Sequence, residues 1–378
     1  DAEYRQWKAE GRIFRAIVMF DMARLWGSFP VITDIARTIT SDNVEEVYPT
    51  YYPPKKTSEE CYQQVIEDLE DGAQNAPDFS ATDRTLLTKT VAQAMLAKVY
   101  AERPVQDYQK VVEYAQKVRS TSGLALEPEF ATLWGYDADK KDCVKRNTSE
   151  SILEVQWTTG GANWESWMYG RCLEDYDFYF TWAKWITPSR DLINDFQQEG
   201  DDVRFNETVV YYECTWANYY PASHYPFMYK LRSGYNNYYK LRLADIILME
   251  AEAYAHLGQA SQAAQLVNQI RSRAGLKNID ASGDMVEKVL HERRLELAFE
   301  GQRWFDLTRW HILVKYVKAN TPTDAETLGT KTTKIQNVSK KNYLLPLPQE
   351  QIILNPNLEQ NWGYSGETGD GPYGAEYE

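Results

Sequence analysis

Two stretches near the middle of the chain alternate aromatic side chains with amide and charged ones. Such a mixture suits a neutral glycan, because a sugar ring offers apolar C–H faces that stack on aromatic rings and hydroxyl edges that need hydrogen-bond partners. The candidate ligand-binding residues are Asn163, Trp164, Trp167, Tyr169, Arg171, Trp182, Trp185, Tyr211, Tyr212, Trp216, Asn218, Tyr219 and Tyr220. Stacking at roughly 1–3 kcal/mol per ring predicts micromolar to millimolar affinity for two or three rings.

The aromatic residues are unevenly distributed along the chain. Residues 157–240 hold 23 of the 51 aromatic residues, and the polar neighbours of Trp164 and Trp216 favour exposed loops there. The segment from Tyr48 to Tyr52 is a further stacking candidate. The alternative for any single ring is a place in the core, which is our expectation for Phe178, Phe180, Phe196 and Phe227.

Signatures of catalysis, cofactor binding and metal binding are absent from the sequence. The chain has four histidines and no HExxH, GxSxG, Walker A or dinucleotide-binding motif. The four cysteines follow no metal or redox spacing, and Asp201, Asp202 and Arg204 are interpreted as a turn rather than a calcium site. We therefore expect no cofactor and no metal.

Two other classes of protein remain compatible with the composition. An all-α glycoside hydrolase would also have an aromatic cleft, with two carboxylates drawn from Glu165, Glu174, Asp175 and Glu213 as acid and base. A tetratricopeptide adaptor would bind peptides and ignore sugars. A glycan panel separates these readings, because a hydrolase releases reducing ends and a binding protein does not.

The charge balance argues against nucleic acid as a partner. The chain of 378 residues has 41 Lys and Arg against 55 Asp and Glu, a net charge of -14, and no basic block. This charge also disfavours highly anionic glycans, although Arg171 and Lys184 could override it locally. No apolar run approaches the roughly 18 residues of a membrane span.

The elements that must position these residues are mainly helices. Apolar spacing and capping residues predict helices over 12–25, 57–70, 88–102, 105–120, 187–196 and 284–300, with a short strand at 152–157. Residues 31–56 have the composition of an extended loop. The tail at 342–364 is expected to wrap the surface, and residues 365–378 are expected to be mobile.

A helix pair occurs twice. Ala97 to Ala101 matches Ala251 to Ala255, and the helices that follow end in similar Gly-Leu pairs. Small residues allow close helix packing, as in tetratricopeptide repeats, whereas the alternative is two unrelated alanine-rich hairpins. The charged run from Arg293 to Arg309 is interpreted as architectural, because its spacing ties helix ends to their neighbours.

The run from His291 to Leu307 (HERRLELAFEGQRWFDL) resembles the C-terminal signature of the SusD/RagB family of surface lipoproteins. Segments 12–33, 57–77, 241–258 and 344–364 resemble the same family in the same order, so the likeness covers nearly the whole chain. Residues 126–240 are the least alike. Members of this family begin with a lipidated cysteine and a helical segment, neither of which is in this sequence, and we expect that this N-terminal part is missing.

The resemblance implies a mostly α fold, in which a scaffold of tetratricopeptide-like helix pairs carries an irregular, loop-rich ligand-binding lobe. It further implies a non-catalytic protein of the outer-membrane surface that binds an oligosaccharide or polysaccharide, or a peptide as RagB-like members do. The implied partner is a SusC-like TonB-dependent transporter, and the implied membrane link is a lipid anchor absent from this chain. We expect one domain over 1–378, with the scaffold at 1–125 and 240–320, the lobe at 126–239 and the tail at 321–378.

Overall fold

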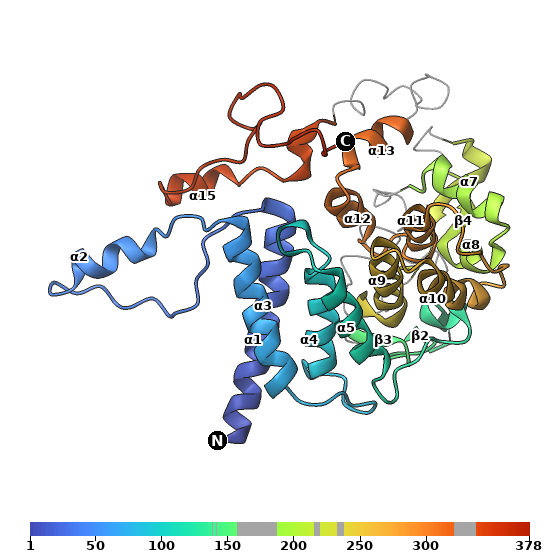
Figure 1. Ribbon diagram of the computed structural model, residues 1–378, viewed down its shortest axis with the longest axis horizontal. Coiled ribbons are helices and arrows are strands. Elements are labelled where there is room, and N and C mark those ends of the chain that lie inside the picture. Colours follow the sequence, from blue (N-terminus) through green and yellow to red (C-terminus); the bar gives the residue numbers. More distant parts are fainter. Residues whose placement is uncertain (138, 141, 157–186, 215–219, 233–237, 321–337) are drawn as a thin grey trace.

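The computed structural model describes residues 1–137, 139–140, 142–156, 187–214, 220–232, 238–320 and 338–378, and within them the chain is mostly helical, as predicted (Figure 1). The α-helices are α1 (Ala2–Trp26), α2 (Val44–Val47), α3 (Ser58–Asn75), α4 (Lys89–Val99), α5 (Tyr108–Arg119), α7 (Arg190–Glu199), α8 (Asp202–Thr208), α9 (Leu243–His256), α10 (Ala260–Arg273), α11 (Met285–Glu296), α12 (Arg303–Arg309), α13 (Leu313–Asn320) and α15 (Gln349–Leu354). The 3-10 helices are η1 (Tyr48–Tyr51), η2 (Arg103–Val105), η3 (Phe130–Leu133), η6 (Ala222–His224) and η8 (Lys340–Tyr343).

The long helices form a row in which each packs against the next. Helix α1 packs against α3, α3 against α4, α4 against α5, α5 against α9, and α9 against α10 and α11 (Figure 1). Their inward faces join into one hydrophobic core, to which α1, α3, α4, α5, α9, α10 and α11 all contribute. Ala97, Ala101 and Ala251 are buried in this core and Ala255 is half-buried, so the small residues lie where adjacent helices approach.

Helix boundaries follow the capping residues of the sequence. Thr57 and Glu60 form the reciprocal capping box that begins α3, in which the Glu60 amide donates to Thr57 Oγ1 at 3.2 Å. The Asp284 carboxylate caps α11 by accepting from the Glu287 amide. The prediction of a turn at 201–204 is wrong, because Asp201 caps helix α8 by accepting from the Arg204 amide.

The described residues form three two-stranded antiparallel sheets beside the helices. Strand β1 (Tyr136–Asp137) pairs with β2 (Asp142–Cys143), β3 (Ser151–Val155) with β6 (Tyr238–Arg242), and β4 (Val209–Tyr212) with β5 (Tyr225–Met228). In the second sheet Ser151 faces Arg242 and Val155 faces Tyr238, with register irregularities between them. Strand β6 runs directly into α9, and so joins the lobe to the row of helices.

The C-terminal tail wraps the N-terminal helices, as predicted. The Leu345 amide donates to the Leu25 carbonyl at 2.7 Å, and the Asn361 side chain donates to the Trp26 carbonyl at 3.0 Å. Gly27 ends α1 with a positive φ of 74°, and a Cβ there would meet the Leu344 side chain at 2.9 Å. The expectation that the chain is loose to its end is wrong for the last residues, because Tyr373 is buried against α12 and α13.

The segment at 31–56 is an extended arm, as predicted, but it contains two short helical turns. Helices α2 and η1 lie at its outer end, and Figure 1 shows the arm projecting on the same side as α15. The side chains of Asn355 and Asn357 donate to the carbonyls of Pro53 and Tyr52, so the tail holds the arm.

Candidate ligand-binding site

A cavity of about 480 Å³ opens between the signature segment and the irregular lobe. Its walls come from the start of α7, the end of β5, the start of β6, the last turn of α11, the following loop, and helices α12 and α13. The volume lies within the range of roughly 300–1,000 Å³ that is typical of small-molecule sites. Elements distant in sequence therefore meet around one ligand-sized space.

The walls of this cavity are mostly apolar and aromatic. Four rings line it, from Tyr238, Phe299, Trp304 and Tyr316, together with aliphatic side chains such as Leu192. Trp304 is 37% exposed although tryptophan is usually well covered, so part of its ring faces solvent. An accessible indole beside a cavity is a surface on which a sugar ring can stack.

Two arginines supply the main charges of the cavity. Arg294 pairs with Asp191 and with Asp195, both on α7, which ties α11 to the lobe. Arg303 lies over the Tyr316 ring, with 4.5 Å from its guanidinium carbon to the ring centroid. Asp191 is the one carboxylate among the described residues that line the cavity.

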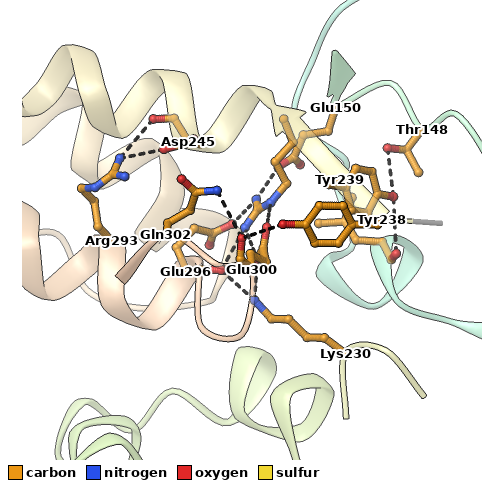
Figure 2. A network of polar contacts seen from close by, with 12 residues as sticks. Thr148, Glu150, Lys230, Tyr238, Tyr239, Asp245, Arg293, Glu296, Glu300 and Gln302 are labelled. Atoms are coloured by element: carbon orange, nitrogen blue, oxygen red, sulfur yellow. Dashed lines mark hydrogen bonds and ion pairs between the residues drawn. The ribbon is translucent and has the colours of Figure 1, made fainter. Parts of the chain in front are cut away.

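The loop between α11 and α12 is held by buried charges. Lys230 Nζ donates to the Glu296 carbonyl at 2.9 Å and to Glu300 Oε1 at 2.7 Å, and Arg242 Nε donates to Glu300 Oε2 at 2.6 Å. Figure 2 shows Tyr238 and Gln302 directed to the same place, where both donate to the Glu300 carbonyl. Glu300 is therefore fixed through its side chain and its main chain.

This anchoring maintains a strained backbone at the cavity wall. Phe299 has a φ of 63° and Gly301 a φ of 74°, and a positive φ is costly for a bulky side chain such as phenylalanine. Such strain persists only where the surroundings impose it, and the bonds to Glu300 are those surroundings. The result is that Phe299 lines the cavity.

Helix α11 carries a buried ionic network that extends beyond this loop. Arg204 pairs with Glu292 and Glu296, and Arg242 pairs with Glu150, Glu296 and Glu300. Burial would raise the pKa of Glu296, but the surrounding cations Arg273, Arg242 and Arg204 outweigh it and hold that pKa well below its ordinary value. The charged run of the sequence thus builds the frame of the cavity.

Lys230 belongs to this network, and its pKa is shifted by burial. Burial lowers the pKa of Lys230 to about 8, against the opposing attraction of Glu300. Lys230 Nζ is also 4.8 Å from the centroid of the Trp134 ring, so the ammonium lies between carboxylates and an aromatic face. This cation holds the loop and is itself screened from solvent.

Most of the ligand-binding residues predicted from sequence lie outside the described residues. This group comprises Asn163, Trp164, Trp167, Tyr169, Arg171, Trp182, Trp185, Trp216, Asn218 and Tyr219. Phe178, Phe180, Glu165, Glu174, Asp175 and Lys184 lie outside them as well. Phe196 and Phe227 are buried, as expected.

Three predicted residues are described and lie on or near the sheet of β4 and β5. Tyr211 stacks on His224 with ring centroids 3.8 Å apart, and Tyr212 packs beside Phe227. Tyr220 donates from its hydroxyl to the Pro188 carbonyl at 2.7 Å, and Arg190 lies over its ring. All three are half-buried, so each keeps part of its ring accessible.

The arm bears the other predicted stacking candidates. Tyr48 and Tyr51 are exposed, and the Tyr48 and Tyr52 rings are tilted 5.2 Å apart. The Tyr51 hydroxyl donates to the Arg37 carbonyl, which orients the ring. These rings belong to the arm and do not line the cavity.

The sequence reasoning missed the aromatic wall of the cavity. Trp304 lies within a regular apolar pattern, and Phe299 and Arg303 belong to the charged run that we interpreted as architectural. The sequence did contain one signal for this wall, because an aromatic residue lies on each side of Gly301. Glycine permits a sharp reversal of the chain, which can bring such residues together. Among the described residues no group of side chains suited to a metal ion is found, and no described helix has the apolar length to cross a membrane.

Two family models match the chain. One, described as the SusD family, matches residues 222–364, and the other, described as starch-binding associating with outer membrane, matches residues 1–101. The first match includes most of the cavity wall, namely the loop between α11 and α12 and helices α11, α12 and α13, but not α7. The second covers the helices at the other end of the row and the arm.

Curated relatives are similar along most of the chain. The SusD-like protein P2 of Formosa agariphila is 25% identical over 93% of this chain and 73% of its own length. A SusD-like protein of Bacteroides ovatus is 26% identical over 80% of this chain and 58% of its own length.

Solved structures show the same fold. A SusD-like protein from Bacteroides fragilis superposes with a TM-score of 0.74 at 21% identity, covering 96% of this chain and 81% of that one. A structure titled as a laminarin binding SusD-like protein gives a TM-score of 0.69 at 22% identity, covering 96% and 80%. The fold is that of these SusD-like structures, and the family models and curated relatives support the SusD/RagB family, as the resemblance predicted.

Proposed function

We propose that this protein is a non-catalytic glycan-binding protein of the outer-membrane surface, which captures an oligosaccharide or polysaccharide and passes it to a SusC-like TonB-dependent transporter. Family membership supports this proposal, as do the starch-binding description of one matching family model and the laminarin-binding title of one structural neighbour. The observation that carries it is the accessible cavity with four aromatic side chains in its wall.

The chemistry of the cavity favours binding over hydrolysis. A glycoside hydrolase needs two carboxyl groups on either side of the scissile bond, roughly 5–10 Å apart. Among the described lining residues Asp191 is the one carboxylate, and it is engaged by Arg294. The described walls of the cavity thus offer stacking surfaces and hydrogen-bond donors, with a single carboxyl group among them.

The remaining predicted residues complete this proposal. The aromatic residues of 157–185 and 211–225, within the lobe at 126–239, would extend the binding surface beyond the cavity, and the arm at Tyr48 to Tyr52 would add a peripheral platform. A lipid anchor that precedes this sequence would hold the protein to the membrane. Weak binding would suit the role, because a protein that delivers its ligand must also release it.

Incubation with a panel of purified polysaccharides tests the proposal. We expect retarded migration of the protein in gels that contain the recognised glycan, a micromolar to millimolar Kd in calorimetry, and no reducing ends released over days. Release of reducing ends would identify a hydrolase instead. Binding of peptides with indifference to every glycan would identify a peptide-binding protein.

A matched pair of tryptophan variants assigns the binding to the cavity. Trp304→Ala should weaken glycan binding about tenfold or more, because it removes one stacking ring. Trp7→Ala on α1 is the control, since Trp7 is 61% exposed and does not line the cavity. Equal affinity in both variants would remove the cavity from the binding site.

A further inference from the structure

The two arginines of the cavity differ in how their charges are balanced. Arg294 has a carboxylate on each side, from Asp191 and Asp195. For Arg303 the described part of the chain provides no ion pair, and its Nε and Nη1 atoms are buried without a hydrogen-bond partner. Among the described residues, its guanidinium lies against the face of Tyr316.

An uncompensated buried guanidinium is unusual among the residues that the structure describes. The buried arginines at positions 204, 232, 242, 271, 293 and 309 each pair with at least one carboxylate. Arg84, whose Nε and Nη1 atoms are also buried without a partner, instead donates from Nη2 to the carbonyls of Thr148 and Ser151. A structural arginine in this fold is therefore held by oxygen atoms, and Arg303 departs from that rule.

The departure has an energetic cost that a ligand can offset. Burying donors of a charged group without acceptors costs on the order of 1–3 kcal/mol or more, and a cation–π contact returns only part of it. An anionic group in the cavity would supply the missing counter-charge to these buried donors. The strained loop that carries Phe299 and leads to Arg303 is a second sign that this wall serves more than packing.

We propose that the cavity binds an anionic sugar residue, with its carboxylate or sulfate ester beside Arg303 and its ring against Trp304. This inference rests on the proposed glycan-binding function and narrows it to a ligand class. The guanidinium selects the anion, and the neighbouring aromatic rings select a flat ring with C–H faces, so a simple inorganic anion meets only half of the requirement.

The negative charge of the protein limits how many consecutive anionic residues the bound glycan can have. The whole chain has a net charge of -14, which repels a long polyanion that runs over its surface. A single anionic residue brings far less charge into that field than a polyanion does, and Arg303 in the cavity wall supplies the opposite charge beside it. The preferred ligand is therefore a glycan with isolated or terminal anionic residues.

Calorimetry on the intact protein with matched disaccharides tests this inference. The probes are digalacturonate, its methyl ester, neutral galactobiose of the same linkage, a glucuronate-containing disaccharide and a sulfated galactobiose. At least one anionic probe should bind about tenfold or more tightly than its neutral counterpart, and the ester should bind like the neutral sugar. These comparisons change only the ligand, so they do not depend on the folding of any variant.

Variants then assign the preference to Arg303. Arg303→Gln should abolish the difference between anionic and neutral probes, and Arg303→Lys should retain part of the difference. Arg5→Gln removes the same charge from an exposed position on α1 and should leave every affinity unchanged. Circular dichroism and the Tm establish that each variant is folded.

The outcomes separate this inference from the proposed function. If neutral glycans bind as tightly as every anionic probe, the inference fails while glycan binding stands. If the preference for anions survives in Arg303→Gln, the anion lies elsewhere and the inference also fails. If no sugar of any kind binds, the proposed function itself is wrong.

Discussion

Single charged side chains determine the shape of the binding wall in this protein. Glu300 accepts from Lys230 and from Arg242, and its carbonyl accepts from Tyr238 and Gln302. These bonds hold a loop whose backbone would otherwise relax from its strained conformation. The interpretation of the charged run as architectural is correct for Glu300, which pairs with Lys230. Arg303 lies in the same run but has no ion-pair partner among the described residues.

We predict that Arg242→Met destabilises the protein by about 3–5 kcal/mol, measured by urea unfolding. Arg242 is buried and pairs with Glu150, Glu296 and Glu300, so its removal leaves three carboxylates with less compensation. Methionine fills similar space and isolates the loss of charge. A loss below about 1 kcal/mol would show that water or rearrangement replaces the ion pairs.

The control is Arg37→Met on the arm. Arg37 pairs with Glu46, but the two side chains are 60% and 69% exposed. Exposed ion pairs contribute about 0–1 kcal/mol, so this variant should unfold nearly as the natural protein does. A large effect here would mean that the arm contributes to global stability more than its exposure indicates.

At the scale of elements, small residues permit the close stacking of helix pairs. Ala251 on α9 is fully buried in the main core, and α9 packs against α5, α10 and α11. The repeat of alanines was visible in the sequence, because side-chain volume at a helical interface is a local property. The helical turn at α8 was not predicted, because its seven residues are stabilised by the cap at Asp201 and by buried pairs of Arg204 with α11.

We predict that Ala251→Leu destabilises the protein by about 1–3 kcal/mol, because a larger side chain overpacks the helix interface. Thermal unfolding followed by circular dichroism measures this change. Ala281→Leu, at an exposed position before α11, is the matched control and should change stability by no more than about 0.5 kcal/mol. Equal effects of the two substitutions would argue against close packing at Ala251.

At the scale of the whole molecule, the tail, the first helices of the row and helix α12 meet around one buried carboxylate. Glu102 follows α4 and is 8% exposed, at a junction that also includes the end of α1, the end of α12 and the tail. Burial raises the pKa of Glu102 to about 7, against the attraction of Arg24, Arg309 and Lys98. The stability of the folded protein therefore depends on pH through the ionisation of Glu102.

The sign of that linkage gives a prediction for Glu102→Gln. A carboxyl with a raised pKa in the folded state stabilises the protein below its unfolded pKa of 4.5, and this contribution is lost as pH rises through about 7. The variant should therefore match the natural protein near pH 4.5 and be more stable by up to about 3 kcal/mol at pH 8. Urea unfolding across this range provides the measurement.

His311 also titrates at this junction, but it contributes equally to the natural protein and to Glu102→Gln and so cancels from their difference. Burial lowers the pKa of His311 to about 4, so its stabilising contribution is lost as pH falls below about 6.5 in both proteins. The difference between the two pH profiles thus belongs to Glu102. Parallel profiles would show that the pKa of Glu102 is not raised in the folded protein.

The sequence by itself determined the family, the helical class, most helix boundaries and the wrapping of the tail. Each of these depends on local features, namely apolar periodicity, capping residues such as Thr57 and Asp284, and a long signature run. Only the tertiary structure decided that Phe299, Arg303 and Trp304 line a cavity with Tyr238 and Tyr316. That outcome depends on contacts among segments far apart in the chain, in which buried carboxylates find their cations, and no local pattern encodes those partners.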